Sequence, residues 1–275
     1  MPKNQPGAGS GRAASFVYSV APKDGSVIGA LFPGVIIAPL IDERAQTLFE
    51  PVRFQFLASA DNATRICITH ERSAIKTFAD AQRQKAIMGA SAVGASTRDY
   101  ANMHKKSAGA MFELVLGYKG TADILLAMER REVDGLCGMD WSSLKSQRSD
   151  WVRDRKVNIL VQVNFEPDDE LTRLGVPSIW QFIKDETDKK AVELIIGQQV
   201  FGRPYVAPPG VLAEQIDILR AAFAATMRDK DFLADAAKTR IDISPSSGER
   251  VQELIERLYA SPKATIERAR ELVKP

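Results

Sequence analysis

An alternation of strand-like and helix-like segments between residues 86 and 140 constrains the fold more than any other feature of the sequence. Three short apolar runs are each followed by small or polar residues and then by a helical pattern; they lie at residues 86–88, 112–118 and 133–139. Such alternation is typical of right-handed β-α-β units, which build a parallel sheet. We therefore predict an α/β fold in which the loops after these three runs open at one edge of a sheet, where ligands bind in such folds.

The first of these loops is a candidate anion site. Its small residues let a ligand approach the backbone closely, and the free N–H groups at a helix start attract negative charge. The glycine spacing is close to that of a P-loop, but Ala95 stands where that motif has its lysine, which favours a carboxylate over a triphosphate. The alternative is an ordinary strand–turn–helix corner. The proposed ligand-binding residues are Gly89, Ala90, Ser91, Gly94, Ala95 and Ser96.

Polar residues in the other two loops are further candidates. Tyr118 either donates its hydroxyl to a ligand or packs at a strand end, and Gly120 lets the backbone approach a ligand. Thr121 is expected to cap a helix over 122–131, and Ser96 to cap the helix that follows the first loop. Asp140 either orients a ligand through water or caps the helix after it.

The charge and composition exclude several classes of protein. The chain has 275 residues, of which 45% are hydrophobic and 26% charged, and its net charge is +2 with no block of like charge. This balance argues against nucleic acid as a partner. No apolar run approaches the roughly 18 residues that a membrane span needs.

The cysteines and histidines give no support for catalysis or for a metal site. Cys67 and Cys137 form no C-x-x-C motif, so they are either two buried free thiols or a single disulfide. Cys67 and His70 are three residues apart on a predicted strand, which places them on opposite faces. The sequence therefore predicts no catalytic residue, no metal site and no cofactor.

Periodicity outside the central stretch predicts the remaining elements. Helices are expected over 10–20 and 74–84, and strands over 26–32, 54–59, 65–69 and 158–163. Two amphipathic helices near the end have apolar stripes that we expect to face the core: Ile216, Leu219, Phe223 and Met227 in one, and Val251, Leu254, Ile255 and Leu258 in the other.

Several short motifs resemble the tripartite tricarboxylate transporter substrate-binding proteins. The motifs are residues 6–10 with Ala13-Ala14, residues 20–25, the loop 89–96, residues 117–120 with 132–135, residues 175–178 and residues 207–210. The alanine-proline-lysine-aspartate-glycine element at 21–25 is the specific one. The resemblance extends from about residue 6 to the end of the chain.

The resemblance implies a bilobed fold of the periplasmic-binding-protein type II class, with two parallel or mixed sheets flanked by helices. Lobe 1 would be residues 1–70 and 200–275, and lobe 2 residues 71–199, with hinges at the crossovers near His70 and Gln199. Lobe 1 would contribute Gly7, Ala8, Gly9 and Ser10, together with the loop 32–34, to the ligand site. Such a protein is periplasmic and monomeric. It closes on a small di- or tricarboxylate and hands it to membrane permease subunits or to a sensor.

Two departures from this pattern leave alternatives open. The sequence shows no signal peptide, and the strand–loop–helix–strand unit with which the family begins is not found before residue 6. The chain is therefore also consistent with a truncated, non-binding member. A cytoplasmic α/β enzyme acting on a phosphorylated or carboxylated metabolite is the other alternative, because the loop at 89–96 is close to a P-loop.

Overall fold

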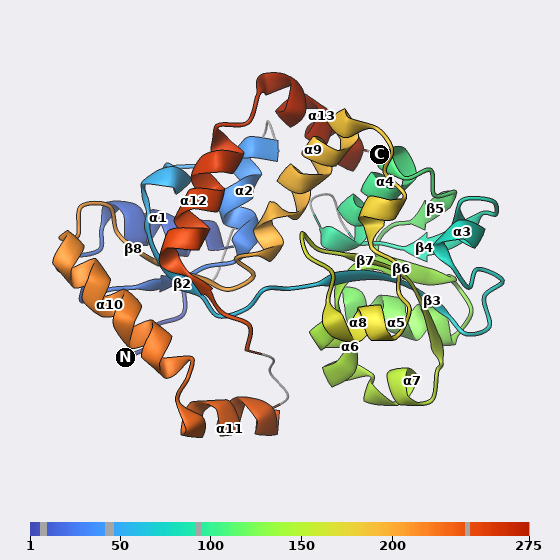
Figure 1. The fold of residues 1–275 in the computed structure, drawn as a ribbon, viewed down its shortest axis with the longest axis horizontal. Helices are drawn as coiled ribbons and strands as arrows, with labels where there is room; N and C mark the ends of the chain where they lie inside the picture. The colour runs from blue at the N-terminus through green and yellow to red at the C-terminus, as the bar shows by residue number, and fades with distance from the viewer. Residues whose placement is uncertain (6–9, 42–46, 92–94, 240–242, 275) are drawn as a thin grey trace. The chain divides into compact units, whose positions relative to one another are not determined.

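A computed structural model of the chain describes residues 1–5, 10–41, 47–91, 95–239 and 243–274 (Figure 1). The chain divides into two compact units, each with its own sheet. Unit 1 consists of Met1–Ala63 and Gly197–Ile266, and unit 2 of Thr64–Ile196 and Glu267–Pro275. None of the helices in the described ranges is long and apolar enough to cross a membrane.

Unit 1 contains an antiparallel sheet with the strand order β1-β8-β2-β9. The strands are β1 (Gly29–Ala30), β2 (Gln55–Ser59), β8 (Pro204–Ala207) and β9 (Ser246–Ser247). The helices are α1 (Gly11–Ser19), α2 (Pro33–Ile41), α10 (Ala213–Thr226), α11 (Lys230–Thr239) and α12 (Gly248–Tyr259), with short 3-10 turns η2 (Pro51–Arg53) and η4 (Gly197–Gln199). Both α10 and α12 contact β2, and Figure 1 shows them on opposite sides of that strand.

The apolar stripe predicted for α12 is confirmed, since Val251, Leu254, Ile255 and Leu258 are all buried. The stripe of α10 is only partly buried. Ile216 lies in the core, and the ring of Phe223 packs against Tyr205 of β8 with 4.9 Å between the ring centroids. Both helices therefore use apolar faces to cover the sheet, as their spacing indicates.

The expected strand over 26–32 is wrong for most of its length. Only Gly29–Ala30 pairs in the sheet, and the next residues form α2, which the sequence reasoning did not predict. Pro33 occupies the first helical position, where its fixed φ and missing N–H are tolerated. A short apolar run such as Val35–Ile37 is equally compatible with a buried strand and a buried helix.

Unit 2 contains a sheet with the strand order β5-β4-β6-β3-β7. The strands are β3 (Arg65–His70), β4 (Ala86–Gly89), β5 (Phe112–Val115), β6 (Gly135–Asp140) and β7 (Val157–Val163). Strand β4 is parallel to both β5 and β6, which confirms the predicted β-α-β arrangement, whereas β3 is antiparallel to β6 and β7. The sheet is therefore mixed, and the carboxyl ends of β4, β5 and β6 share one edge.

Helices flank this sheet. They are α3 (Phe78–Ala81), α4 (Ser96–Ser107), α5 (Thr121–Glu129), α6 (Trp141–Gln147), α7 (Ser149–Arg153), α8 (Asp169–Arg173) and α9 (Glu186–Ile196), with a 3-10 turn η3 (Ile179–Gln181). The helix expected over 74–84 is much shorter. A capping box between Thr77 and Asp80 starts α3 four residues later than predicted, because it satisfies the first backbone N–H groups there.

The units divide the chain differently from the lobe boundaries expected at 70 and 200. Strand β3 pairs within the sheet of unit 2, and so does not belong to the first unit. The last turns of α13 (Lys263–Val273) also belong to unit 2. There, Arg268 Nε lies 2.6 Å from Asp188 Oδ1, and Asn102 Nδ2 donates to the carbonyl oxygen of Val273 at 3.2 Å.

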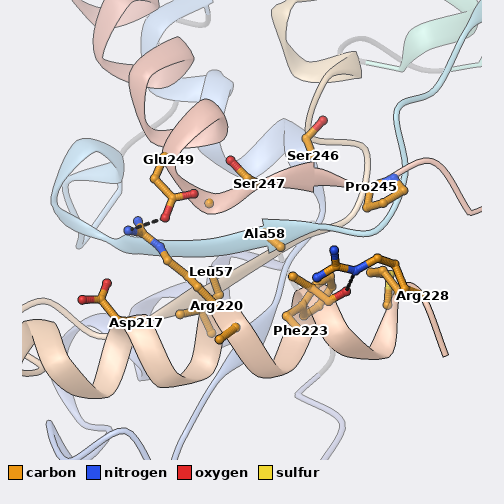
Figure 2. A pocket seen from close by; sticks show the side chains of 14 residues that line it. Leu57, Ala58, Asp217, Arg220, Phe223, Arg228, Pro245, Ser246, Ser247 and Glu249 are labelled. Carbon is orange, nitrogen blue, oxygen red and sulfur yellow. Dashed lines mark hydrogen bonds and ion pairs between the residues drawn. The ribbon is translucent and has the colours of Figure 1, made fainter.

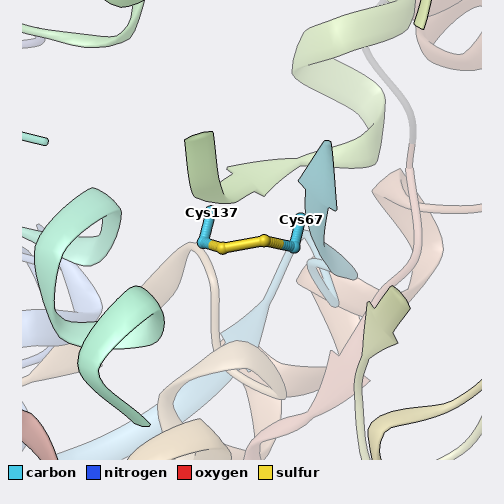
Figure 3. Close-up of a disulfide and its surroundings, with 2 residues drawn as sticks. All are labelled: Cys67 and Cys137. Atoms are coloured by element: carbon cyan, nitrogen blue, oxygen red, sulfur yellow. A yellow bond between two sulfur atoms is a disulfide. The ribbon is translucent and has the colours of Figure 1, made fainter. Parts of the chain in front are cut away.

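Cys67 and Cys137 are joined by a disulfide (Figure 3). They are direct neighbours across the antiparallel pair of β3 and β6, so strand pairing brings together two residues that are 70 positions apart in the chain. Of the two alternatives left open by the sequence, two free thiols is therefore the wrong one. Spacing along the chain could not decide this, because the register of β3 against β6 is a long-range property.

Candidate functional site

Two contacts at one edge of the unit 2 sheet join the end of β4 to the loop after β5, and the start of α4 to β6. A Cβ atom at Gly89 would lie 3.3 Å from Tyr118 Cε2, so the end of β4 and the loop after β5 are in contact. A Cβ atom at Gly138 would lie 2.4 Å from the carbonyl oxygen of Ser96, so the start of α4 rests on β6. The parallel arrangement places the ends of these three strands at one edge of the sheet, as expected.

The N–H groups of the first loop are partly used within the protein. Ala90 donates to the carbonyl oxygen of Val115 at 2.9 Å, and the Ser91 N–H donates to Thr97 Oγ1 at 3.0 Å. Gly94 lies outside the described residues. These two donors are therefore not available to a ligand, and among the described residues of this loop the remaining candidates are at the start of α4.

At that start, Ala95 is the N-cap and Ser96 is the first helical residue, so the expected capping role of Ser96 is wrong. No side chain caps the helix, and in the described part of the chain the backbone N–H groups of Ser96 and Thr97 have no acceptor. These are two of the orphan donors that every helix start presents. The start of α4 can therefore donate to an anion.

The start of α5 also has backbone N–H groups without an acceptor among the described residues. Gly120 is the N-cap with extended backbone, and Thr121 is the first helical residue rather than the predicted cap. Within the described ranges no acceptor is found for the backbone N–H groups of Thr121 and Ala122. Two helix starts at one sheet edge thus offer uncharged donors.

Of the two roles considered for Tyr118, packing is the one that the structure shows. Its ring packs against the apolar core of unit 2, and its hydroxyl has no hydrogen-bond partner among the described residues. Burial, followed by the nearby Glu132 carboxylate, raises the pKa of Tyr118 above its usual value. A tyrosine hydroxyl is protonated at neutral pH and can donate a hydrogen bond.

Asp140 forms an ion pair that the sequence reasoning missed. Its Oδ1 lies 3.0 Å from Nε of Arg65, and both side chains are largely buried, with 18% and 21% exposed respectively. Arg65 also donates to the carbonyl oxygen of Gly138 at 2.9 Å. Asp140 occupies the N-cap of α6 without making a side-chain cap, so the capping expectation is wrong. Arg65 therefore compensates the negative charge of the Asp140 carboxylate.

In unit 1, Ser10 lies beside the loop after β1. Its backbone has a φ of 77°, in the left-handed region, and its Oγ accepts a hydrogen bond from the backbone N–H of Phe32 at 3.1 Å. The other predicted residues of this wall, Gly7, Ala8 and Gly9, lie outside the described residues. Ser10 and Phe32 thus lie side by side; that they contribute to a ligand site remains a prediction.

A cavity of about 170 Å³ opens at this place. It is lined by Ser10, Ala30, Leu31, Phe32, Arg203 and Tyr205. Strand β1 ends there and β8 begins there, since Ala30 pairs with Tyr205. Arg203 was not predicted from the sequence, because nothing in the run Phe201–Tyr205 indicates which way a charged side chain points.

A larger cavity of unit 1, of about 480 Å³, lies between α10 and the start of α12 (Figure 2). Its central cation, Arg220, pairs with Glu249 at 3.0 Å and donates twice to the carbonyl oxygen of Phe56. Those groups satisfy one another, and no residue predicted for binding lies there. We therefore interpret this groove as structural.

Among the described residues, one cluster has the donor types of a metal site: Cys67, His104 and Cys137, whose ligand atoms lie within 4.8 Å of one another. A metal needs thiolates, whereas these sulfur atoms are bonded to each other. His104 is completely buried, and burial lowers its pKa to about 3. This cluster belongs to the core and does not fit a metal ion in its disulfide form.

Comparison with protein-family models finds no match for this chain. No curated protein matches it either.

Solved structures do match, at low sequence identity. A TctC solute binding protein from Polaromonas, solved without ligand, has a TM-score of 0.73 at 15% identity, covering 94% of this chain and 83% of that one. A protein from R. palustris solved with adipate has a TM-score of 0.64 at 16% identity, with coverages of 94% and 82%. MatC from Rhodopseudomonas palustris, with bound malate, has a TM-score of 0.61 at 16% identity, with coverages of 98% and 85%.

These likenesses confirm the predicted fold class. The chain shares with these solved structures a mixed α/β architecture of two sheets flanked by helices. The first of these neighbours is also of the kind that the sequence motifs resemble.

Proposed function

We propose that this protein is a periplasmic solute receptor that captures a small organic carboxylate between its two units and works without chemistry. The units act as the two lobes, and the crossovers after Ala63 and after Ile196 act as hinges. The closed, loaded receptor is monomeric and delivers its ligand to the membrane subunits of a tripartite transporter or to a sensor.

One observation supports this proposal above the others. The first turns of α4 and α5 both lie at the carboxyl edge of one sheet, and each has backbone N–H groups for which the described residues provide no acceptor. Neutral donors of this kind suit a carboxylate, which accepts several hydrogen bonds at once. The adipate and malate bound to structural neighbours are ligands of this class.

Proline variants test these donors individually. Ser96→Pro and Thr121→Pro each remove one N–H group at the first helical position, where proline is tolerated. The preceding residues, Ala95 and Gly120, already have the extended backbone that proline requires. Ala213→Pro is the matched control, because it occupies the first position of α10 after an equally extended Leu212.

The readout is calorimetric titration of refolded, ligand-free protein with adipate, malate and citrate. We expect at least one acid to bind, and each of the two site variants to weaken it about 10-fold or more, since a hydrogen bond to a charged group contributes about 1.5–3 kcal/mol. The control should bind as the wild type does. Absence of binding by any acid, or equal affinities for all variants, would contradict the proposal.

A further inference from the structure

His104 of α4 is a buried polar side chain without a hydrogen bond. It has no exposed surface, and neither Nδ1 nor Nε2 has a partner among the described residues. The rings of Phe78 and Phe112 lie near it, with 5.6 and 6.4 Å between the ring centroids. Burying an imidazole among apolar groups costs free energy, because its nitrogens lose their hydrogen bonds to water. Such groups are rare, and a redox role or a bound ion is among their explanations.

The sulfur atoms of Cys67 and Cys137 lie beside this imidazole. One ring nitrogen and the two sulfur atoms are all within 4.8 Å of one another, and both cysteines are fully buried. Donor atoms that share one zinc ion lie at most about 4.6 Å apart, which is twice a Zn–S bond of about 2.3 Å. The three side chains are therefore spaced almost as one metal ion requires.

The disulfide withholds its sulfur atoms from a metal, because the form of cysteine that binds metal is the thiolate. Two electrons and two protons convert the disulfide into two thiols, and each thiol releases its proton to solvent when a metal binds. Strand pairing keeps the two cysteines together without the bond, since β3 is hydrogen-bonded to β6 on one side and to β7 on the other. Reduction therefore frees the sulfur atoms and leaves their strands in place.

The donor set selects the kind of ion. Thiolate and imidazole suit Zn²⁺, whereas Ca²⁺ and Mg²⁺ take oxygen ligands. Two thiolates and a neutral imidazole carry two negative charges, which a divalent ion cancels. The resulting group has no net charge and can stay in an apolar core, whereas a monovalent ion such as Cu⁺ would leave a buried charge. Three protein ligands are also the number found in zinc sites that keep a fourth position open.

We propose that the reduced protein binds a zinc ion between Cys67, Cys137 and His104, so that the disulfide and the metal are alternatives at one place. The site lies within unit 2 and goes beyond the proposed function. The disulfide joins β3 to β6 only, whereas the metal also joins α4 to both strands. His104 has no hydrogen bond in the disulfide form because its partner belongs to the other form.

The test uses the full chain, which contains no other cysteine and only one other histidine, His70. The protein is unfolded in urea with a phosphine, which reduces the disulfide while water converts the phosphine to its oxide. It is then refolded without oxygen, with or without metal. Unfolding gives the reductant and the metal access to residues that are fully buried in the folded chain. Co²⁺ serves as the spectroscopic probe, because its bonds to thiolate absorb light, and Zn²⁺ is then titrated against it.

Three variants identify the ligands. His104→Leu removes the imidazole, and Cys67→Ser/Cys137→Ser removes both thiolates. His70→Gln is the matched control, because His70 is a second buried histidine of unit 2 that lies outside the cluster. Urea unfolding of each reduced protein establishes whether it folds.

We expect the reduced wild type and reduced His70→Gln to bind one metal ion per chain, with thiolate-to-cobalt absorption. The oxidised wild type and the double serine variant should bind none. His104→Leu should weaken zinc binding about 100-fold or more, because losing an outer-shell partner alone costs about 10- to 100-fold. Zinc should raise the urea midpoint of the reduced wild type and leave that of the oxidised protein unchanged.

Three results would overturn the inference. They are a reduced wild type that binds no metal, a reduced wild type that refolds neither with zinc nor without it, and a His104→Leu variant with wild-type affinity. Each of them leaves the proposed function standing, since no carboxylate enters the experiment.

Discussion

The carbonyl oxygen of Ser96 approaches Gly138 so closely that a Cβ atom at Gly138 would lie 2.4 Å from it. Gly138 has a φ of +73°, in the left-handed region, and it lies in β6 immediately before Met139 and Asp140. The start of α4 is therefore positioned directly by the backbone of a neighbouring strand. Glycine is required there both for conformation and for space.

A pair of glycine variants separates these two requirements. Gly109 has a similar φ of +71° but nothing within 4 Å of its ideal Cβ, so Gly109→Ala should cost about 1–2 kcal/mol of unfolding free energy from conformation alone. Gly138→Ala adds a clash with backbone and should cost about 2–5 kcal/mol. Only Gly138→Ala should also weaken carboxylate binding. Urea unfolding and titration measure both effects, and equal destabilisation would disprove the close approach.

The Arg65–Asp140 pair predicts a measurable coupling. The burial of this ion pair is intermediate. Breaking the pair with Asp140→Asn should therefore lower the free energy of unfolding by about 1–3 kcal/mol, between the losses expected for exposed and for fully buried pairs. The double variant Arg65→Gln/Asp140→Asn should recover part of that loss, because no unpaired charge remains. A double-mutant cycle by urea unfolding gives the coupling energy. Strictly additive effects would mean that the two side chains do not interact in solution.

His104 predicts how stability depends on pH. Burial lowers its pKa to about 3 in the folded protein, whereas the unfolded chain has a value near 6.5. Between these values the unfolded state binds the extra proton, so stability decreases as pH falls below about 6.5, by about 1.4 kcal/mol per pH unit. The contribution is fully present above that range.

The variant His104→Leu should lack this contribution. Between pH 7 and pH 5, we expect the wild type to lose about 2 kcal/mol more unfolding free energy than the variant. His70, whose pKa is also lowered by burial, is present in both proteins and cancels in the comparison. Parallel pH profiles would contradict the assignment of a neutral, buried His104.

The disulfide between Cys67 and Cys137 should contribute substantially to stability. It closes a loop of 70 residues. Loss of such a cross-link lowers the free energy of unfolding by about 2–4 kcal/mol, largely because the unfolded chain gains conformational entropy. A thiol reductant should therefore lower the urea midpoint of the wild type. The same reductant should not affect the variant Cys67→Ala/Cys137→Ala. A wild type that responds as little as that variant would show that the bond does not form.

Local pattern was sufficient to predict the site's framework in unit 2. The apolar runs ending at Met88 and Met139 have strand length, and the small residues after them allow tight turns into helices. Parallel pairing then follows from β-α-β chirality, and it brings the loops to one edge without any knowledge of side-chain contacts. The edge was therefore predictable although its individual donors were not.

The features that were missed or left open depend on long-range register or on ambiguous local pattern. The Arg65–Asp140 pair and the disulfide both arise because β3 runs antiparallel to β6, which no local spacing specifies. The helix α2 was missed because a short apolar run fits strand and helix equally. Arg203 was missed because its place in a cavity depends on the meeting of β1 and β8, far apart in sequence.

The C-terminal residues are bonded to the helix whose first turn is proposed to hold the ligand. Lys106 Nζ donates to the carbonyl oxygens of Glu271 and Lys274, at 2.8 and 2.9 Å, and Asn102 Nδ2 donates to that of Val273. A purification tag or fluorescent fusion placed after residue 275 would consequently be anchored beside α4. Binding assays are therefore better served by an attachment at a surface loop of unit 1.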